Sequence, residues 1–167
     1  SIAESLERFR PVAEAARNVA CAGAEPISAT NCLNAGNPER PETMWQFAQI
    51  VDGIAAACRA LEVPITGGNV SLYNETEGRA IFPTPVLGVV GLLDDASTVA
   101  TRVFKRAGAI VVLLGDNLGE LGGSEYLSVM HGLVRGDAPA LDLAREVALQ
   151  RLIVRAIREG LVESAHD

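Results

Sequence analysis

The sequence lacks any concentration of positive charge and any apolar run long enough to cross a membrane. Its 14 Lys and Arg residues are outnumbered by 21 Asp and Glu residues, which gives a formal net charge of −7. Proteins that bind a nucleic-acid backbone carry a basic patch or stripe, so nucleic acid is not an expected partner. The longest apolar run, Ala109 to Leu114, is far shorter than the roughly 20 residues of a membrane-spanning helix. Residues 1–4 also lack the features of a signal peptide, so we expect a soluble, cytoplasmic protein.

Cysteine and histidine are also scarce. Cys21, Cys32 and Cys58 are an odd number without a Cys-x-x-Cys pair, and His131 and His166 are the only imidazoles. Neither a disulfide framework nor a zinc site is therefore indicated, and we expect buried thiols. What the chain does have is 49% hydrophobic residues, enough for one ordinary core or for one medium domain and part of a second.

Hydrophobic spacing and turn residues predict mixed α and β structure in the first hundred residues. The clearest element is a helix from Glu42 to Leu61, whose apolar face is formed by Met44, Phe47, Ala48, Val51, Ile54, Ala55, Cys58 and Leu61. A helix over 2–20 is expected to be kinked or restarted at Pro11 and to end at Gly23. Strands are expected over 26–32, 63–66 and 86–92, with polar connections over 34–38 and 75–79.

The polar interval over 94–106 is predicted to separate two domains, residues 1–100 and residues 101–167. Ala109 to Leu114 is expected to be a compact buried strand, followed by a glycine-rich loop and a short helix from Ser124 toward His131. A second helix over 141–157 is expected to bury Leu141, Ala144, Ala148, Leu149, Leu152, Ile153 and Ala156. About 60 residues are few for a separate core, so we expect the beginning of a larger domain, whose uncovered apolar faces would allow a homodimer.

The run Gly67-Gly68-Asn69-Val70-Ser71 can bind a ligand at the end of a strand. Two glycines let a phosphate approach the backbone, and the Asn69 amide oxygen suits Mg²⁺, a hard cation that prefers oxygen donors. Ser71 lies two residues further and points to the same side if the strand continues. The same pattern also fits a β-bulge or a tight turn with a capping Asn, and on pattern alone this structural interpretation is favoured.

A second polar run, Thr30 to Pro38, delivers three Asn residues from a strand into a loop. Their amides can contact an adenine or a ribose, but Asn residues also form Asx turns with their own backbone, which pattern alone favours. The functional interpretation gains from the arrangement, because two polar segments at strand ends bracket one amphipathic helix.

Three other features are weaker candidates. The loop from Leu121 to Tyr126 can hold an anion at a helix N-terminus, although it lacks the Lys of a P-loop and fits a structural cap better. His131 lies near a helix end, where a structural role is the more common one. His166 and Asp167 can form an acid/base or metal pair, but the sequence does not show their surroundings.

Several segments, in this order, resemble phosphoribosylformylglycinamidine synthase, also called formylglycinamide ribonucleotide amidotransferase. The most specific is the run from Gly68 to Glu75, and the resemblance covers nearly the whole chain. The other matching segments are Thr30 to Pro38, Pro41 to Phe47, Phe104 to Gly108, Leu121 to Tyr126 and Ser164 to Asp167. The resemblance implies an α/β (α+β) fold: the mixed-sheet N-terminal domain of the second of two aminoimidazole ribonucleotide synthetase-like copies, and the start of its C-terminal α/β domain.

Matched position by position, the resemblance implies ATP contacts at Asn31 and Gly68, a Mg²⁺ contact at Asn69 and a formylglycinamide ribonucleotide contact at Ser71. No catalytic residue is implied in this chain. Two positions depart from the family pattern: Asn31 stands where many members have Asp, and Ala35 stands where Phe is usual. Loss of that ring would cost packing if the position is buried.

The implied reaction converts the amide of formylglycinamide ribonucleotide to an amidine, with ATP, Mg²⁺ and ammonia derived from glutamine. The implied partners are this substrate, a glutaminase subunit or domain, and the remaining domains of a longer chain, without which we expect this piece to be inactive. Two alternatives stay open: a scaffold copy that holds an auxiliary nucleotide, and a relative of the same fold that acts on another substrate.

Overall fold

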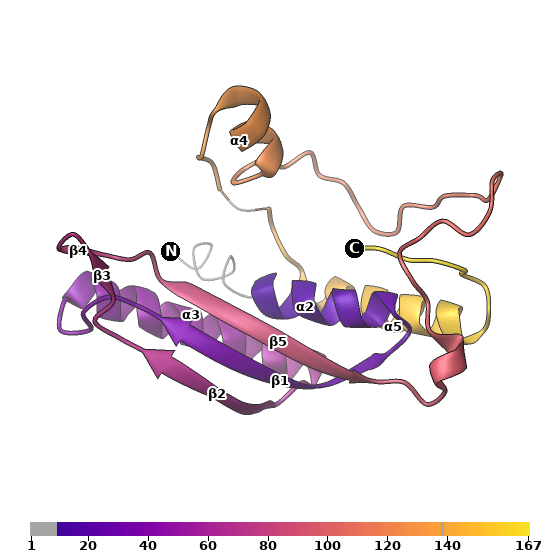
Figure 1. Cartoon of the computed structure of the whole chain (residues 1–167), viewed down its shortest axis with the longest axis horizontal. Coiled ribbons are helices and arrows are strands. Elements are labelled where there is room, and N and C mark those ends of the chain that lie inside the picture. The colour runs from indigo at the N-terminus through magenta and orange to yellow at the C-terminus, as the bar shows by residue number, and fades with distance from the viewer. Residues whose placement is uncertain (1–9, 138) are drawn as a thin grey trace.

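The computed structural model describes residues 10–137 and 139–167 (Figure 1). The elements of the first half are α2 (Arg10–Cys21), β1 (Glu25–Asn34), α3 (Pro41–Leu61), β2 (Ile65–Ser71), β3 (Glu75–Thr76), β4 (Arg79–Ala80) and β5 (Thr84–Leu92). They are followed by a 3-10 helix, η2 (Ala96–Thr98), and by α4 (Glu125–His131) and α5 (Leu143–Arg158). Helices alternate with strands along the first half, which confirms the predicted mixture.

A mixed three-stranded sheet, in the order β2-β1-β5, forms the centre of the fold. The central strand β1 is parallel to β2 and antiparallel to β5. Because β1 and β2 run in the same direction, α3 must carry the chain back along the sheet between them. The two strands therefore finish at the same edge of the sheet.

Helices α2 and α3 lie on one side of this sheet, and α5 packs against both of them (Figure 1). The core between sheet and helices contains Val12, Leu33, Ile54, Ala57 and Cys58. A second cluster joins α2 to α5 and contains Ala20, Ala100, Ile153, Val154 and Ile157. The helices thus support the sheet from behind and leave its opposite face open within the described residues.

Helix α3 has nearly the predicted bounds but a different buried face. Its first turn contains Pro41, where the missing N–H costs nothing, and it ends where Glu62 adopts a left-handed conformation. There the Glu62 N–H donates to the Arg59 carbonyl and the Val63 N–H to the Cys58 carbonyl. Met44 and Val51, predicted to be inside, are 47% and 40% exposed. The buried positions are Thr43, Gly53, Ile54, Ala57 and Cys58. The small residues on this side allow α2 and α5 to pack against α3, which apolar spacing alone does not predict.

Helix α2 begins beside Pro11, as the restart predicted, and Gly23 follows its end with a φ of +86°. The expected helical residues 2–9 lie outside the described part of the chain. In α5 the predicted face is only partly right: Ile153 is buried, but Ala144, Ala148 and Leu152 are exposed. Glu146 and Gln150 are buried instead. These polar side chains face inward because α2 supplies partners for them.

The predicted buried strand over Ala109–Leu114 is wrong. No strand is formed there, and Ile110, Val111, Val112 and Leu113 are between 67% and 90% exposed. A strand needs a hydrogen-bonded neighbour, and the described residues place none beside this segment. Helix α4 agrees with prediction, since the Ser124 hydroxyl caps it by accepting from the Leu127 N–H at 3.2 Å. No helix in the described residues is long and apolar enough to span a membrane.

Candidate functional site

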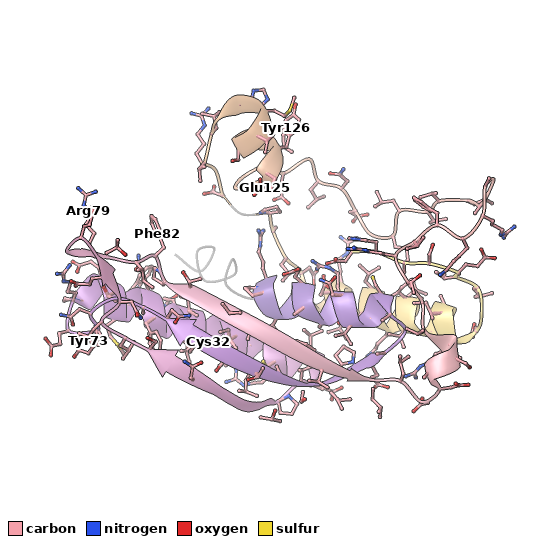
Figure 2. The ribbon with its side chains drawn as sticks, in the orientation of Figure 1. Cys32, Tyr73, Arg79, Phe82, Glu125 and Tyr126 are labelled. Atoms are coloured by element: carbon pink, nitrogen blue, oxygen red, sulfur yellow. The ribbon has the colours of Figure 1, made fainter. Side chains whose placement is uncertain are left out.

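The candidate site lies at the edge of the sheet where β1 and β2 finish. The parallel register pairs Asn31 with Gly68, Cys32 with Asn69, and Asn34 with Ser71. The four residues predicted to bind ligands therefore lie on two neighbouring strands, within four consecutive positions. This arrangement agrees with the predicted pair of polar segments that bracket one helix, and Figure 2 shows Cys32 and Tyr73 at this part of the sheet.

The expected strand over 63–66 is instead β2, which runs from Ile65 through both glycines to Ser71. The register shifts between Ala29 and Thr30, whose partners are Ile65 and Gly67, so Thr66 is an extra residue on the β2 side. The β-bulge proposed for this segment is thus present, while the alternative of a tight turn at the glycines is wrong. Because the strand continues, Asn69 and Ser71 point to the same face, as predicted.

Gly68 is held against Asn31 too closely for any side chain. Its φ is +150°, and a Cβ at this position would overlap both the carbonyl oxygen and the Oδ1 of Asn31. The neighbouring Gly67 has open space where its Cβ would be. Position 68 therefore requires glycine for a structural reason, because the oxygens of Asn31 occupy the space that a side chain would need.

Side-chain hydrogen bonds divide the asparagines of the site into two groups. Asn37 forms the Asx turn that the structural interpretation favoured, since its Oδ1 accepts from the Glu39 N–H at 2.8 Å, and Asn34 donates to the Thr84 carbonyl at 3.2 Å. The Asn31 and Asn69 side-chain amides have no hydrogen-bond partner in the described residues, and Asn69 is exposed. The two asparagines predicted to contact ligands are thus the two whose side-chain amides are available for it.

The segments that follow β1 and β2 are bound to each other by main-chain hydrogen bonds. Ala35 N–H donates to the Ser71 carbonyl at 3.0 Å, and Tyr73 N–H donates to the Gly36 carbonyl at 3.0 Å. Tyr73 has a φ of +60°, which a non-glycine residue adopts only when its surroundings enforce it. The two strand ends consequently form one rigid unit.

Outside this rigid unit two weaker links connect the same segments. The Tyr73 hydroxyl lies 3.4 Å from a Glu39 carboxylate oxygen, and Arg40 forms an exposed ion pair with Glu75 at 3.7 Å. Both links are solvent-exposed, so they contribute little stability by themselves. They do show that the loop after β1 and the β3–β4 hairpin approach each other at this end of the sheet.

Ala35, which departs from the family pattern, is fully buried. The position is therefore an interior one, and its backbone is held by Ser71 and Asn74. A ring at this position would have to be buried as well, so the smaller Ala must be accommodated by the packing around it.

The three weaker candidates have structural roles. Ser124 caps α4, which is the structural interpretation of the Leu121 to Tyr126 loop, and α4 has fewer than two turns. The ring of His131 packs edge-on against Tyr126, with 5.4 Å between centroids. Asp167 lies 3.5 Å from the Arg17 guanidinium instead of facing the His166 ring, whose Nδ1 is 2.6 Å from the Asp167 carbonyl oxygen.

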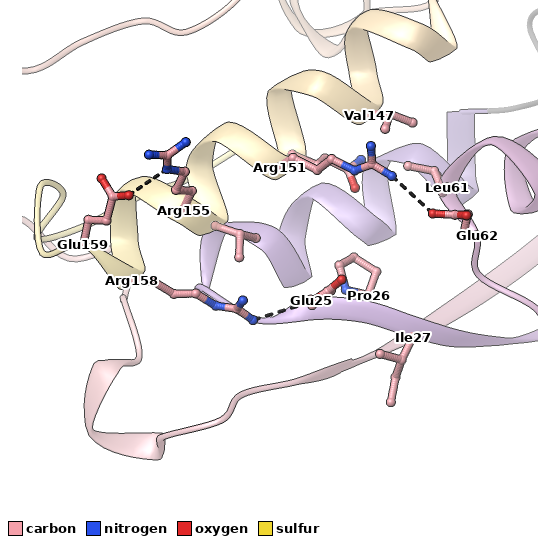
Figure 3. Close-up of a pocket in the computed structure, with 12 residues that line it drawn as sticks. Glu25, Pro26, Ile27, Leu61, Glu62, Val147, Arg151, Arg155, Arg158 and Glu159 are labelled. Atoms are coloured by element: carbon pink, nitrogen blue, oxygen red, sulfur yellow. Dashed lines mark hydrogen bonds and ion pairs between the residues drawn. The ribbon is translucent and has the colours of Figure 1, made fainter.

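A cleft of about 670 Å³ lies elsewhere, between α5 and the start of β1 (Figure 3). Its charged lining is already paired: Arg151 with Glu62 at 3.2 Å, and Arg155 with Glu159 at 2.6 Å. None of the four predicted site residues lines it. The cleft therefore adds nothing to the site at the strand ends.

Comparison with known proteins identifies the family of this chain. The model of the "AIR synthase related protein, N-terminal domain" family matches residues 10–93, half of the chain. The chain belongs to this family. The match spans α2 to β5 and so includes all four predicted site residues, and it confirms the expected fold.

Among curated proteins, a phosphoribosylformylglycinamidine synthase subunit PurL from Anaeromyxobacter sp. (strain Fw109-5) is 61% identical over 156 residues. Those residues are 93% of this chain but 20% of that protein, so the chain spans about a fifth of the length of the curated relatives it matches. The high identity confirms the resemblance on which the expectations about function depend.

Solved structures of PurL are also similar. PurL from T. maritima complexed with AMPPCP aligns with 92% of this chain and 22% of its own, at 25% identity and a TM-score of 0.57. The PurLQS structure from Thermotoga maritima aligns with 58% of this chain and 16% of its own, at 32% identity and a TM-score of 0.52. Both likenesses support the α/β fold described above.

Proposed function

We propose that this chain forms part of an ATP-dependent carbon–nitrogen ligase of purine nucleotide synthesis that acts in the cytoplasm. The ligase would convert formylglycinamide ribonucleotide, ATP and ammonia to formylglycinamidine ribonucleotide, ADP and phosphate. The observation that carries the proposal is the 61% identity to a phosphoribosylformylglycinamidine synthase subunit over nearly the whole chain. The glutaminase that supplies ammonia, and the other domains of the ligase, would be partners of this chain.

The strand-end site would bind the reactants without transferring protons. Asn31 and the backbone at Gly68 would contact ATP, and Ser71 would donate to or accept from formylglycinamide ribonucleotide. In the reaction, the oxygen of the substrate amide takes the γ-phosphoryl group of ATP, and ADP leaves. Ammonia then adds to the amide carbon, and phosphate leaves to give the amidine. All four residues are neutral, so their contribution is orientation and hydrogen bonding.

Asn69 would hold Mg²⁺ through its side-chain oxygen. This oxygen is exposed and without a partner in the described residues, which fits a metal that usually keeps several waters and takes one or two protein oxygens beside phosphate. The ion would offset the negative charge of the phosphates. No group of three His, Cys, Asp or Glu residues in the described part of the chain is placed to hold a metal, so the remaining ligands would come from phosphate, water or other domains.

An auxiliary nucleotide site in the same enzyme is the second candidate function. The side chains of Asn31, Asn69 and Ser71 are neutral, so they can bind a nucleotide but do not act as acids or bases. Binding alone is sufficient for a nucleotide that stabilises the enzyme. The division of this chain into residues 1–100 and residues 101–167 at the polar interval likewise remains a proposal. The association of two copies of this chain through uncovered apolar faces is also a proposal.

The ligase function is tested by assaying the full-length protein with formylglycinamide ribonucleotide, Mg-ATP and ammonium chloride, which replaces the glutaminase. Release of ADP and formation of the amidine should both require the ribonucleotide. A matched reaction without the ribonucleotide measures background ATP hydrolysis. Equal ADP release in both reactions, without amidine product, would reject the ligase assignment.

A further inference from the structure

Asn74 occupies the junction between the two strand ends. Its side-chain Nδ2 donates to the Ser71 carbonyl at 2.9 Å and to the Ala35 carbonyl at 3.0 Å, and lies 3.1 Å from Ser71 Oγ. Its main-chain N–H also donates to the Ala35 carbonyl at 3.1 Å, and its carbonyl accepts from Ile81 N–H at 3.1 Å. One residue thus connects the end of β2, the loop after β1 and the segment that leads into β5.

The Ser71 hydroxyl depends on this one side chain. Ser71 Oγ lies 3.2 Å from Asn74 Oδ1 and 3.1 Å from Asn74 Nδ2, and it has no other hydrogen-bond partner in the described part of the chain. A serine hydroxyl is free to rotate among three staggered positions unless a neighbour fixes it. Asn74 therefore selects the rotamer of Ser71, while leaving the hydroxyl able to make a further hydrogen bond.

We propose that Asn74 is a positioning residue for the substrate contact made by Ser71. This inference rests on the proposed ligase function, in which Ser71 contacts formylglycinamide ribonucleotide. Asn74 itself is half-buried and directed at protein groups, so it acts through Ser71 and through the spacing of the two strand ends.

The chemistry of an amide is specifically suited to this position. The Nδ2 group faces two carbonyl oxygens and therefore has to be a donor, whereas Oδ1 faces a hydroxyl that can donate to it. An Asp at position 74 would have nearly the same shape but would place an acceptor against the Ala35 and Ser71 carbonyls. Asn74→Asp is consequently a sharper probe than truncation, because it removes the donor and keeps the volume.

The experiment compares steady-state kinetics of the full-length protein, with ammonium chloride as nitrogen donor, for Ser71→Ala, Asn74→Ala, Asn74→Asp and the two combinations with Ser71→Ala. Asn37→Ala, which removes an Asx turn from the same region, is the matched control. We expect each Asn74 variant to raise the KM for formylglycinamide ribonucleotide by about tenfold, the equivalent of one lost hydrogen bond. The KM for ATP should stay within about twofold, and the Ser71→Ala background should abolish the effect of Asn74 substitution.

A merely structural role gives a different pattern. It would lower the melting temperature, shift both KM values together, and add to the effect of Ser71→Ala, and this result would overturn the positioning role while leaving the ligase function intact. Failure of both Asn74 variants to give folded protein would overturn it as well. A wild-type protein that forms no amidine would instead overturn the ligase function and the positioning role together.

Discussion

Gly68 lies beside Asn31 across the parallel pair of β1 and β2, and the oxygens of Asn31 fill the space that a side chain at position 68 would need. The contact fixes the backbone path of β2 at the point where the nucleotide is proposed to bind. It also explains why one glycine of the Gly67-Gly68 pair is structurally required and the other is not.

Replacement of Gly68 by Ala should therefore be costly. The added Cβ meets Asn31 in a strand segment where φ is +150°, so we expect a loss of about 2 kcal/mol of stability and a weaker Kd for Mg-ATP. Gly67→Ala is the control, because nothing lies within 4 Å of its Cβ position. The melting temperature and the Kd for Mg-ATP are measured for both variants. Equal values for Gly68→Ala and Gly67→Ala would contradict the close contact between Gly68 and Asn31.

Substitution of Asn69 tests the proposed metal contact. Because its side-chain oxygen has no protein partner, Asn69→Ala should leave the melting temperature almost unchanged and raise the Mg²⁺ concentration needed for half-maximal activity severalfold. Asn69→Asp keeps an oxygen ligand and should restore the wild-type requirement or lower it. An unchanged Mg²⁺ titration for Asn69→Ala would remove this residue from the metal site.

The ion pair that joins α2 to α5 should matter more than the exposed pairs. Arg17 Nη1 lies 2.9 Å from Glu146 Oε2, and the Glu146 side chain is only 6% exposed. Arg17→Ala leaves a buried carboxylate without its cation, so we expect a loss of about 1–3 kcal/mol. Arg151→Ala breaks an exposed pair with Glu62 and should cost less than about 0.5 kcal/mol. Equal losses in chemical denaturation would contradict the role of burial.

Cys58 should resist alkylation. Burial raises the pKa of its thiol, so the folded protein keeps the proton at a pH where the unfolded chain has begun to lose it. The contribution of Cys58 to stability is thus present below the ordinary thiol pKa and declines as pH rises above it. Mass spectrometry after iodoacetamide treatment at pH 8.5 should show slower modification of Cys58 than of the half-buried Cys32. Equal rates in the native protein would mean that Cys58 is accessible.

The helices could be located from their apolar spacing in the sequence, but the face that each helix buries could not. The bounds of α3 follow from its spacing and from Pro41, yet Met44 is exposed while Thr43 and Gly53 are buried. Small residues are inside because α2 and α5 pack against α3 there. In α5, Glu146 and Gln150 are inside because Arg17 and the Ala13 carbonyl are their partners, and such tertiary partners leave no local signal.

The site shows the same division. The candidate ligand contacts Asn31, Gly68, Asn69 and Ser71 were visible in the sequence, as was their placement on either side of one helix. The continuation of β2 through both glycines was not visible, because glycine pairs more often form turns and the bulge at Thr66 depends on pairing with β1. Ala109 to Leu114 has the composition of a buried strand but no neighbour in the described chain, so composition alone misled there.

The role of the strand-end site is tested most directly by turnover of the full-length protein with Asn69 and Ser71 both replaced by Ala. If these residues bind the reactants, amidine formation from formylglycinamide ribonucleotide, Mg-ATP and ammonia should fall at least tenfold at subsaturating substrate, while the melting temperature without ligands stays close to that of the wild type. Unchanged turnover together with a lowered melting temperature would contradict this role and assign the site to an auxiliary nucleotide that stabilises the enzyme.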